Sequence, residues 1–466
     1  MERVSIRRIF LITVDCLRAD YVGCISGCSL TPNIDRFARD SVVFTRAFSN
    51  GPATTQSFTA ILTSTYFLIH GDMSLSPHFT TLARVLSNNG FRTVAFHSNP
   101  FLSRKLGWDN GFNEFYDFMD VVKIPSAAVI RLDRSAKLIG AISKITGPFI
   151  RNKRLQSILR TVYYTRSNLE IPYVEGRELN NNVIKWINQH KEKKFFLWMH
   201  YMDPHRPYIP PNYSQYFGSR REALMFDISI HSRIMRGDVS KGELEKLKWL
   251  YAKEVEYVDK CIGEFLDFLE QLNILESSLI ILTADHGEPF MEHKKIEHNY
   301  DIIYNEAIHV PLIIYGLTDD HRTINDNAQL LDVPPTIVDA LGIKKPKDFI
   351  GKSLIRIWKE KQGCGPIFSE SAKPDLINLT YDTRKKVISC ITEDWKLIIN
   401  EFWDTIELYN INKDFREKNN LAESELEVVK RLTTIIQNHL AYETSYRHKL
   451  KAKKIRKRLK ALSYLQ

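Results

Sequence analysis

Three apolar runs, far apart in the chain, lead directly into residues that can bind a metal ion. The runs are Arg8–Val14, Phe195–Met199 and Ser278–Leu282. Short continuous apolar runs rich in β-branched and aromatic residues are typical of strands buried on both faces of a parallel sheet. The carboxyl ends of such strands share one edge of the sheet, where open α/β sheets place their ligands. The sequence therefore predicts an α/β fold with a polar site at that edge.

The residues that follow the three runs have metal-binding side chains. A carboxylate beside an imidazole suits Zn²⁺, Mn²⁺ or Fe, and a carboxylate alone suits Ca²⁺ or Mg²⁺. A metal-centred site is the simplest interpretation, and a set of unrelated capping and surface residues is the alternative. The candidate residues are Asp15, His200, Asp203, His205, Asp285 and His286.

A candidate nucleophile lies in the segment after Ser49. A Pro/Gly loop there gives way to Thr54, Thr55 and Ser57, followed by Thr59–Leu62, which is expected to form the first turns of a helix. A hydroxyl at a helix N-terminus can be activated by a metal, and the free N–H groups can hold an anion. The alternative is that one of these hydroxyls only caps the helix.

Ordered motifs along nearly the whole chain resemble the sulfatase branch of the alkaline phosphatase superfamily. This resemblance implies an α/β fold with a central mixed, mostly parallel sheet flanked by helices and a smaller C-terminal α+β subdomain. The motifs are Val14–Asp20 with Thr31–Asp35, His200–His205, Thr283–Glu288, Glu292-His293, His298, Tyr304–Glu306, Leu331–Gly342, Gly351–Leu354 and Glu407–Asp414.

Two departures from the family pattern bear on the chemistry. Sulfatases carry a Cys or Ser in a C/S-x-P/A-x-R pattern that is oxidised to formylglycine. Alignment of the helix places Thr54 at this position, with Gln56 for the Pro or Ala and Phe58 for the Arg. Threonine cannot become formylglycine, because its β-carbon bears a methyl group and would give a ketone. Where many sulfatases hold sulfate with a Lys and a His, this chain has Ser98 and Pro100.

A threonine nucleophile is known elsewhere in the superfamily, in phosphodiesterases, phosphoglycerol and phosphoethanolamine transferases and nucleotide pyrophosphatases. The resemblance therefore implies a covalent phospho-threonine on Thr54 and a divalent cation (Ca²⁺, Mn²⁺, Mg²⁺ or Zn²⁺). It assigns the cation to Asp15, Thr54, Asp285 and His286, and leaving-group or phosphoryl contacts to His205 and His298. Further candidates for the site are Cys16, His200, Asp203 and His293.

Three functions remain open from the sequence. The favoured one is metal-dependent hydrolysis or transfer of phosphoric esters. The second is hydrolysis of sulfuric esters without formylglycine. The third is a non-catalytic relative that binds anions or membranes, although a scaffold has no use for the whole retained set of Asp15, Thr54, His205, Asp285 and His286.

Composition and charge divide the chain further. With 466 residues, 44% hydrophobic, it can bury a large core. We expect a catalytic domain over 1–365 with a helical insertion at about 120–175, a C-terminal α+β subdomain over 366–445, and a basic tail over 446–466. The net charge is +10, and the basic tail holds nine Lys or Arg and no acid, so the rest is nearly neutral.

The basic tail carries apolar residues at roughly helical spacing, which is typical of a peripheral membrane or polyanion contact. A solvated terminal helix is the alternative. No motif indicates specific nucleic-acid recognition, and the sequence leaves the oligomeric state open. Six Cys without a CxxC pair, and an N-terminus that leads straight into a core strand, favour a cytoplasmic location, with the inner membrane face as a possible place of contact. The expected substrate is an anionic ester.

Overall fold

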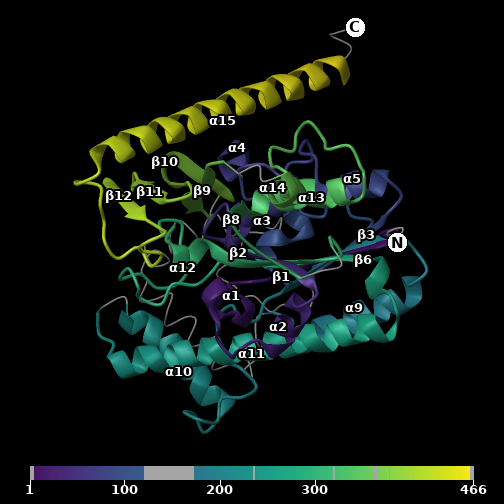
Figure 1. Cartoon of the computed structure of the whole chain (residues 1–466), viewed down its shortest axis with the longest axis horizontal. Helices are drawn as coiled ribbons and strands as arrows, with labels where there is room; N and C mark the ends of the chain where they lie inside the picture. The colour runs from purple at the N-terminus through teal and green to yellow at the C-terminus, as the bar shows by residue number, and fades with distance from the viewer. Residues whose placement is uncertain are drawn as a thin grey trace, which may run out of the picture.

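A computed structural model describes residues 5–119, 173–234, 237–318, 321–360, 365–376 and 378–461. Its largest element is an eight-stranded sheet, which runs through the middle of the molecule (Figure 1). The predicted insertion at about 120–175 lies almost wholly outside the described residues. The strands, in sheet order, are β4 (Glu114–Tyr116), β3 (Arg92–Phe96), β5 (Phe195–Tyr201), β1 (Arg8–Val14), β6 (Ser278–Ala284), β7 (His309–Tyr315), β2 (Ser41–Phe48) and β8 (Arg322–Gln329).

The sheet is mixed and mostly parallel, as predicted. β1 pairs in parallel with β5 on one side and with β6 on the other, and β7 is antiparallel to both of its neighbours. Every residue of β1, β5 and β6 is buried. Strands buried on both faces read as continuous apolar runs, which explains the three runs in the sequence.

Helices cover both faces of this sheet (Figure 1). The longest of these, α11 (Lys241–Gln271), begins with a capping box: Ser240 Oγ accepts from the Glu243 N–H, and the Glu243 carboxylate accepts from the Ser240 N–H. One face carries α1 (Gly23–Ser26), α2 (Pro32–Ala38), α9 (Gly176–His190), α10 (Arg220–Ile234) and α11 (Lys241–Gln271). The other carries α3 (Thr54–Thr63), α4 (Phe67–His70), α5 (Leu82–Asn88), α13 (Val333–Ala340) and α14 (Leu354–Glu360), and the short α12 (Asn305–Ile308) precedes β7.

The C-terminal part forms a second, antiparallel sheet in the order β12-β11-β10-β9, beside the first. The long helix α15 (Leu426–Ala461) crosses above this sheet and extends past it (Figure 1). The smaller α+β subdomain predicted from the sequence is thus present, and the helix continues from it into the basic tail. The strands are β9 (Ile367–Asp375), β10 (Thr380–Ile391), β11 (Trp395–Asn400) and β12 (Thr405–Asn410).

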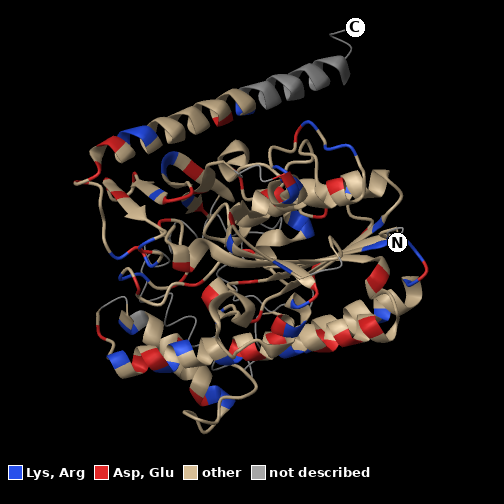
Figure 2. Cartoon of the chain, viewed as in Figure 1, with Lys and Arg blue, Asp and Glu red and all other residues tan. Residues whose placement is uncertain are grey.

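Charged residues lie mainly on the helices and loops, and the central strands are largely uncharged (Figure 2). Along α10 and α11, basic and acidic residues alternate, as on a solvated helix face. Within the described part of the chain, no helix has the length and apolar content needed to cross a bilayer.

Candidate active site

The site forms where the central parallel strands end. Asp15 follows β1, and Asp285 and His286 follow β6. Because β1 and β6 pair in parallel with Val14 opposite Ala284, the two carboxylates emerge side by side. His200, near the end of β5, lies opposite Thr13 in the register. The strand ends therefore bring together residues from three distant parts of the sequence.

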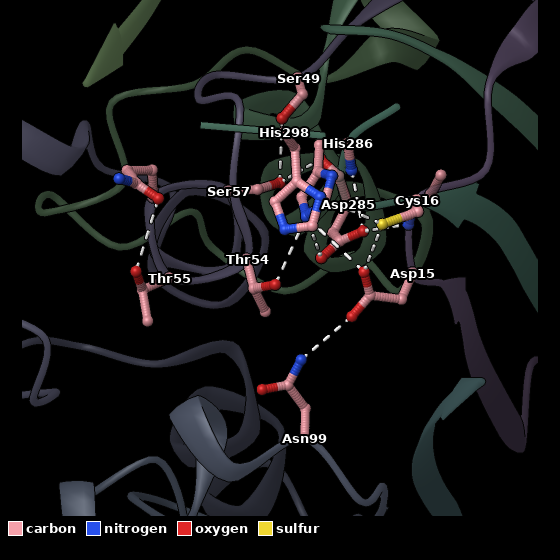
Figure 3. Close-up of polar contacts among 12 residues, drawn as sticks. Asp15, Cys16, Ser49, Thr54, Thr55, Ser57, Asn99, Asp285, His286 and His298 are labelled. Carbon is pink, nitrogen blue, oxygen red and sulfur yellow. Dashed lines mark hydrogen bonds and ion pairs between the residues drawn. The ribbon is translucent and has the colours of Figure 1, made fainter. Parts of the chain in front are cut away.

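The distances define a compact cluster of possible ligands (Figure 3). His286 Nε2 lies 3.4 Å from Asp285 Oδ2 and 3.7 Å from Asp15 Oδ1. His200 Nε2 lies 3.2 Å from Asp15 Oδ2, and Thr13 Oγ1 contacts the other nitrogen of that ring at 3.0 Å. The side chains of Asp15, His200, Asp285 and His286 are all fully buried.

The two carboxylates are too close to ionise independently. Burial, and then the charge of Asp15, raise the pKa of Asp285 to about 7. Burial opposes ionisation of Asp15 as well, but His205, His200 and His286 hold the pKa of Asp15 below its usual range. Asp285 Oδ2 is buried and has no hydrogen-bond partner among the described residues. A buried, unpaired carboxylate oxygen beside a second carboxylate and an imidazole fits a divalent cation.

Thr54 begins helix α3, and its Oγ1 lies 3.4 Å from His286 Nε2. The N-cap residue is Ala53, so the capping role considered from the sequence does not apply to Thr54. Ser57, one turn on, donates from its hydroxyl to the Asp285 carbonyl oxygen at 2.6 Å. This bond ties the start of α3 to the end of β6. The positive end of the helix dipole thus faces the carboxylate cluster.

The C-terminal sheet supports the same helix end. The Tyr381 hydroxyl makes a short hydrogen bond with Thr55 Oγ1, and Gln56 Nε2 donates to Ser371 Oγ at 3.3 Å. Both Tyr381 and Ser371 belong to the second sheet. The subdomain therefore helps to position the segment that carries Thr54.

Two histidines line the other side of the cluster. The His298 ring centre lies 4.3 Å from that of His286 and 5.3 Å from that of His205. Burial opposes protonation of His298, but Glu288, 3.0 Å from its Nδ1, raises the pKa of His298 to about 9. Burial lowers the pKa of His205, whose Nδ1 lies 2.6 Å from the Arg206 carbonyl oxygen. The site therefore pairs a charged imidazole with a neutral one.

Cys16 contacts both the carboxylate cluster and His298. Its Sγ donates to Asp15 Oδ1 at 3.1 Å and lies 3.5 Å from His298 Nδ1. Burial, and then Asp15, raise the pKa of the Cys16 thiol well above its usual value, so the sulfur keeps its proton. Its backbone is in the left-handed region at φ 61°, and the Tyr251 hydroxyl donates to its carbonyl oxygen at 2.7 Å.

Two of the further candidates lie elsewhere. Asp203 belongs to none of the possible ligand groups within the described residues, and its Oδ2 faces Gly176, where an added Cβ would lie 3.3 Å away. His293 contacts the Glu306 carboxylate at 2.6 Å and the Glu417 carbonyl oxygen at 2.8 Å. His293 thus links its loop to the C-terminal subdomain. The structure brings together the other candidates, and their catalytic and metal-binding roles stay predictions.

Asn99 and Glu288 are site residues to which the sequence assigned no role. Asn99 Nδ2 donates to Asp15 Oδ2 at 3.0 Å. Ser98, at the position compared with a sulfate-holding residue, accepts from the Val174 N–H at 3.0 Å through its Oγ. The location of Asn99 just after the apolar strand Arg92–Phe96 is a signal of the same kind as the one that identified Asp15.

Comparison with known proteins decides the family. The sulfatase family matches residues 7–343, which is most of the chain. The chain belongs to the sulfatase family. The C-terminal domain described as "N-sulphoglucosamine sulphohydrolase, C-terminal" matches residues 292–443.

Among curated proteins, an uncharacterized sulfatase, YidJ, of Escherichia coli is 23% identical over 439 residues, covering 89% of this chain and 82% of the relative. Two solved structures share the fold. The phosphonate monoester hydrolase of Agrobacterium radiobacter has a TM-score of 0.68 at 18% identity, covering 95% of this chain and 96% of that one. BT4656, solved with its substrate D-glucosamine-2-N,6-O-disulfate, has a TM-score of 0.66 at 17% identity, covering 96% and 99%. This sulfatase-family protein is thus an ester hydrolase of the alkaline phosphatase superfamily.

Proposed function

We propose that this protein cleaves phosphoric esters with Thr54 as the nucleophile, through a covalent phospho-threonine. The observation that carries the proposal is the position of Thr54, at the first turn of α3 with its hydroxyl 3.4 Å from His286 Nε2. Formylglycine, which sulfatases use at this position, cannot be made from threonine. A hydroxyl nucleophile transferring a phosphoryl group needs no such modification.

A divalent cation would be held by Asp15, Asp285 and His286, with Thr54 beside it. An imidazole in the donor set favours Zn²⁺ or Mn²⁺ over Ca²⁺ or Mg²⁺. When bound, the ion supplies a Lewis acid that favours the ionised form of the Thr54 hydroxyl and offsets charge on the phosphoryl oxygens.

The residues of the chain supply the proton transfers. The ionised Thr54 oxygen attacks phosphorus, the bond to the leaving oxygen breaks, and protonated His298 donates its proton to that oxygen. Glu288 keeps His298 protonated at neutral pH. Neutral His205, with Nδ1 held by the Arg206 carbonyl oxygen, accepts a proton at Nε2 from the incoming water or alcohol, which attacks phosphorus and releases Thr54.

The test is turnover of p-nitrophenyl phosphate, a phenyl phosphonate ester and p-nitrophenyl sulfate with Zn²⁺, Mn²⁺, Mg²⁺ or Ca²⁺ added. We expect phosphoester turnover, phosphate on the Thr54 peptide by mass spectrometry, and a fall of at least about 10³-fold in Thr54→Ala. Thr59→Ala is the matched control, because Thr59 lies on the same helix and its hydroxyl donates to the Thr55 carbonyl oxygen of that helix. Phosphoester turnover that survives Thr54→Ala would refute the mechanism.

Sulfuric ester hydrolysis is the second candidate, and the family match favours it. It would require Thr54 or a water molecule to attack sulfur without formylglycine. Turnover of p-nitrophenyl sulfate far above that of the phosphorus esters would select this function. If the Thr54→Ala variant then loses sulfate turnover, Thr54 is the nucleophile and becomes sulfated. If sulfate turnover survives in this variant, the nucleophile is a water molecule.

We also propose that the protein works in the cytoplasm, with the basic tail against an anionic membrane surface. The five cysteines within the described residues are all free, in keeping with a reducing compartment. Each Lys or Arg close to such a surface adds about 1 kcal/mol. Co-sedimentation should occur with phosphatidylserine-containing vesicles and not with phosphatidylcholine alone, and should fall when the basic residues of the tail are changed to Gln. Equal binding to both vesicles would contradict this.

A further inference from the structure

A second buried cluster of possible ligands lies away from the active site, between helix α15 and strand β9. His439 and Glu443 are one helical turn apart on α15 and therefore share one face of the helix. Glu370 comes from β9. His439 Nε2 makes a short ion pair with Glu370 Oε1 and lies 3.6 Å from Glu443 Oε1. One ligand atom from each of the three residues lies within 4.8 Å of the other two.

The cluster is buried and its charge is not balanced. The side chains of Glu370, His439 and Glu443 are 0%, 6% and 3% exposed. Both carboxylate oxygens of Glu443 are buried and have no hydrogen-bond donor among the described residues. With both carboxylates ionised, the cluster keeps a net negative charge whether or not the imidazole is protonated. An unpaired buried carboxylate costs several kcal/mol, so a compensating positive species is expected.

The surrounding groups do not supply that compensation. The charges of Arg447 and Lys386 act on Glu443, but neither side chain is among its hydrogen-bond partners in the described residues, and Lys386 is paired with Glu401 at 3.2 Å. The His439 ring stacks on Phe368, with ring centres 3.8 Å apart, and meets the edge of Tyr66 at 4.5 Å. These aromatic rings cover the imidazole and keep the cluster dry.

We propose that Glu370, His439 and Glu443 bind a structural Zn²⁺ ion. His439 Nε2, one oxygen of Glu370 and the two unpartnered oxygens of Glu443 offer the four donors of a structural Zn²⁺ site, whereas Ca²⁺ requires six to eight oxygens. A divalent ion with a neutral imidazole brings the charge of the cluster to zero. The Leu68 N–H donates to Glu370 Oε2 at 3.0 Å, which orients this carboxylate as second-sphere contacts orient metal ligands.

The ion would fasten the C-terminal helix to the nucleophile loop. The Glu370 N–H donates to the Asn50 carbonyl oxygen at 2.9 Å, and Ser369 Oγ donates to the Ser49 carbonyl oxygen. Both acceptors precede Thr54 by only a few residues. This zinc site is independent of the reaction proposed above, because it shares no ligand with the active site.

The test is the zinc content of the full-length protein after incubation with Zn²⁺ alone and removal of unbound metal. In the Asp15→Asn/Asp285→Asn variant, which lacks both active-site carboxylates, we expect one equivalent of Zn²⁺ per chain. Adding Glu443→Gln should remove that equivalent, whereas adding Glu427→Gln should not, because Glu427 is an exposed acid on the same helix. A chelator should lower the melting temperature of the first variant and leave that of the Glu443→Gln variant unchanged.

Either of two results would overturn the proposal. The first is an Asp15→Asn/Asp285→Asn variant that holds no zinc and shows no response to chelator, and the second is zinc that persists in this variant after Glu443→Gln. The cluster would then hold a proton shared between Glu370 and Glu443 in place of a metal. If the Glu443→Gln variant does not fold, the zinc content and chelator response of the Asp15→Asn/Asp285→Asn variant decide alone. Neither the zinc content nor the chelator response depends on whether phosphoric or sulfuric esters are the substrate.

Discussion

The active-site carboxylates and the Lys396–Glu417 pair are equally buried, but only the charge of Glu417 is neutralised by a basic side chain. Lys396 Nζ lies 2.6 Å from Glu417 Oε1 and donates to Asn305 Oδ1 at 2.9 Å, and both charged side chains are fully buried. The Asn305 N–H donates to Glu417 Oε2 at 2.6 Å. Asp285 Oδ2, in contrast, lies near no Lys or Arg among the ion pairs of the described residues; it has only the His286 imidazole, with Nε2 at 3.4 Å, and a second carboxylate beside it.

The difference separates a structural charge from a functional one. Where the chain supplies its own counter-charge, as at Glu417, the pair joins the β9–β12 subdomain to the segment before β7. At Asp285, where the chain sets a second carboxylate and no basic side chain beside a buried carboxylate oxygen, we expect the compensating charge to come from an ion or a proton. The same reasoning led to the proposal for Glu443.

The largest effect on stability is expected from breaking the paired charge. Glu417→Gln leaves the Lys396 ammonium buried without a carboxylate, which should cost about 3–5 kcal/mol in the free energy of unfolding. Urea unfolding would measure the loss. Lys396→Met combined with Glu417→Gln should recover part of it, because the buried charge is then absent. A loss below about 1 kcal/mol would show that the pair contributes little.

Removing the unpaired charge should have the opposite sign. In metal-free protein at pH 8, Asp285→Asn should raise the free energy of unfolding by about 1–3 kcal/mol. The pKa of Asp285 is raised to about 7 in the folded protein, from a usual value of 3.8. The folded state therefore loses stability as the pH rises from about 4 to 7, and Asn removes this loss.

The check is urea unfolding of wild type and variant in chelator at pH 8 and at pH 4, where the gain should vanish. Destabilisation at pH 8 would mean that Asp285 is already compensated by the protein itself.

The His293–Glu306 ion pair extends the comparison to a pair that titrates and from which we expect a smaller effect on stability. Burial opposes its protonation, but Glu306 raises the pKa of His293 to about 9. Because this pKa is raised, its contribution to stability is complete below about pH 6.5 and is lost as the pH rises through 9. His293→Gln should therefore lower the melting temperature at pH 6 and match wild type near pH 10. A difference that does not change with pH would point to packing against Tyr304 as its main role.

The sequence predicted the sheet and the strand-end site because both depend on local patterns. Apolar runs mark buried strands, and the residue just after such a strand lies at the sheet edge, which located Asp15, Asp285 and His286. Thr54 was identified only by alignment with the family. The local sequence does not distinguish Thr54 from Thr55. Only the orientation of α3 determines which of the two hydroxyls faces His286 and which faces Tyr381.

The residues without a predicted role depend on contacts between distant segments. Asn99 meets Asp15 across two strand-end loops, and Glu370 meets His439 across a sheet and a helix. Asp203 and His293 show the converse. Each has a suitable side chain within a motif, but the turn of its loop directs it away from the cluster, and residue type does not determine that turn.

The order of strands has a consequence for the synthesis of this protein. Strand β2 leads directly to Thr54, but its two neighbours in the sheet, β7 and β8, begin only at His309 and Arg322. On the ribosome, the nucleophile segment is thus made long before the two strands that become its lateral partners. Until then β2 is an apolar strand with unpaired edges, which is prone to aggregation. We therefore expect the nascent chain to depend on chaperones until the segment beyond β8 has emerged.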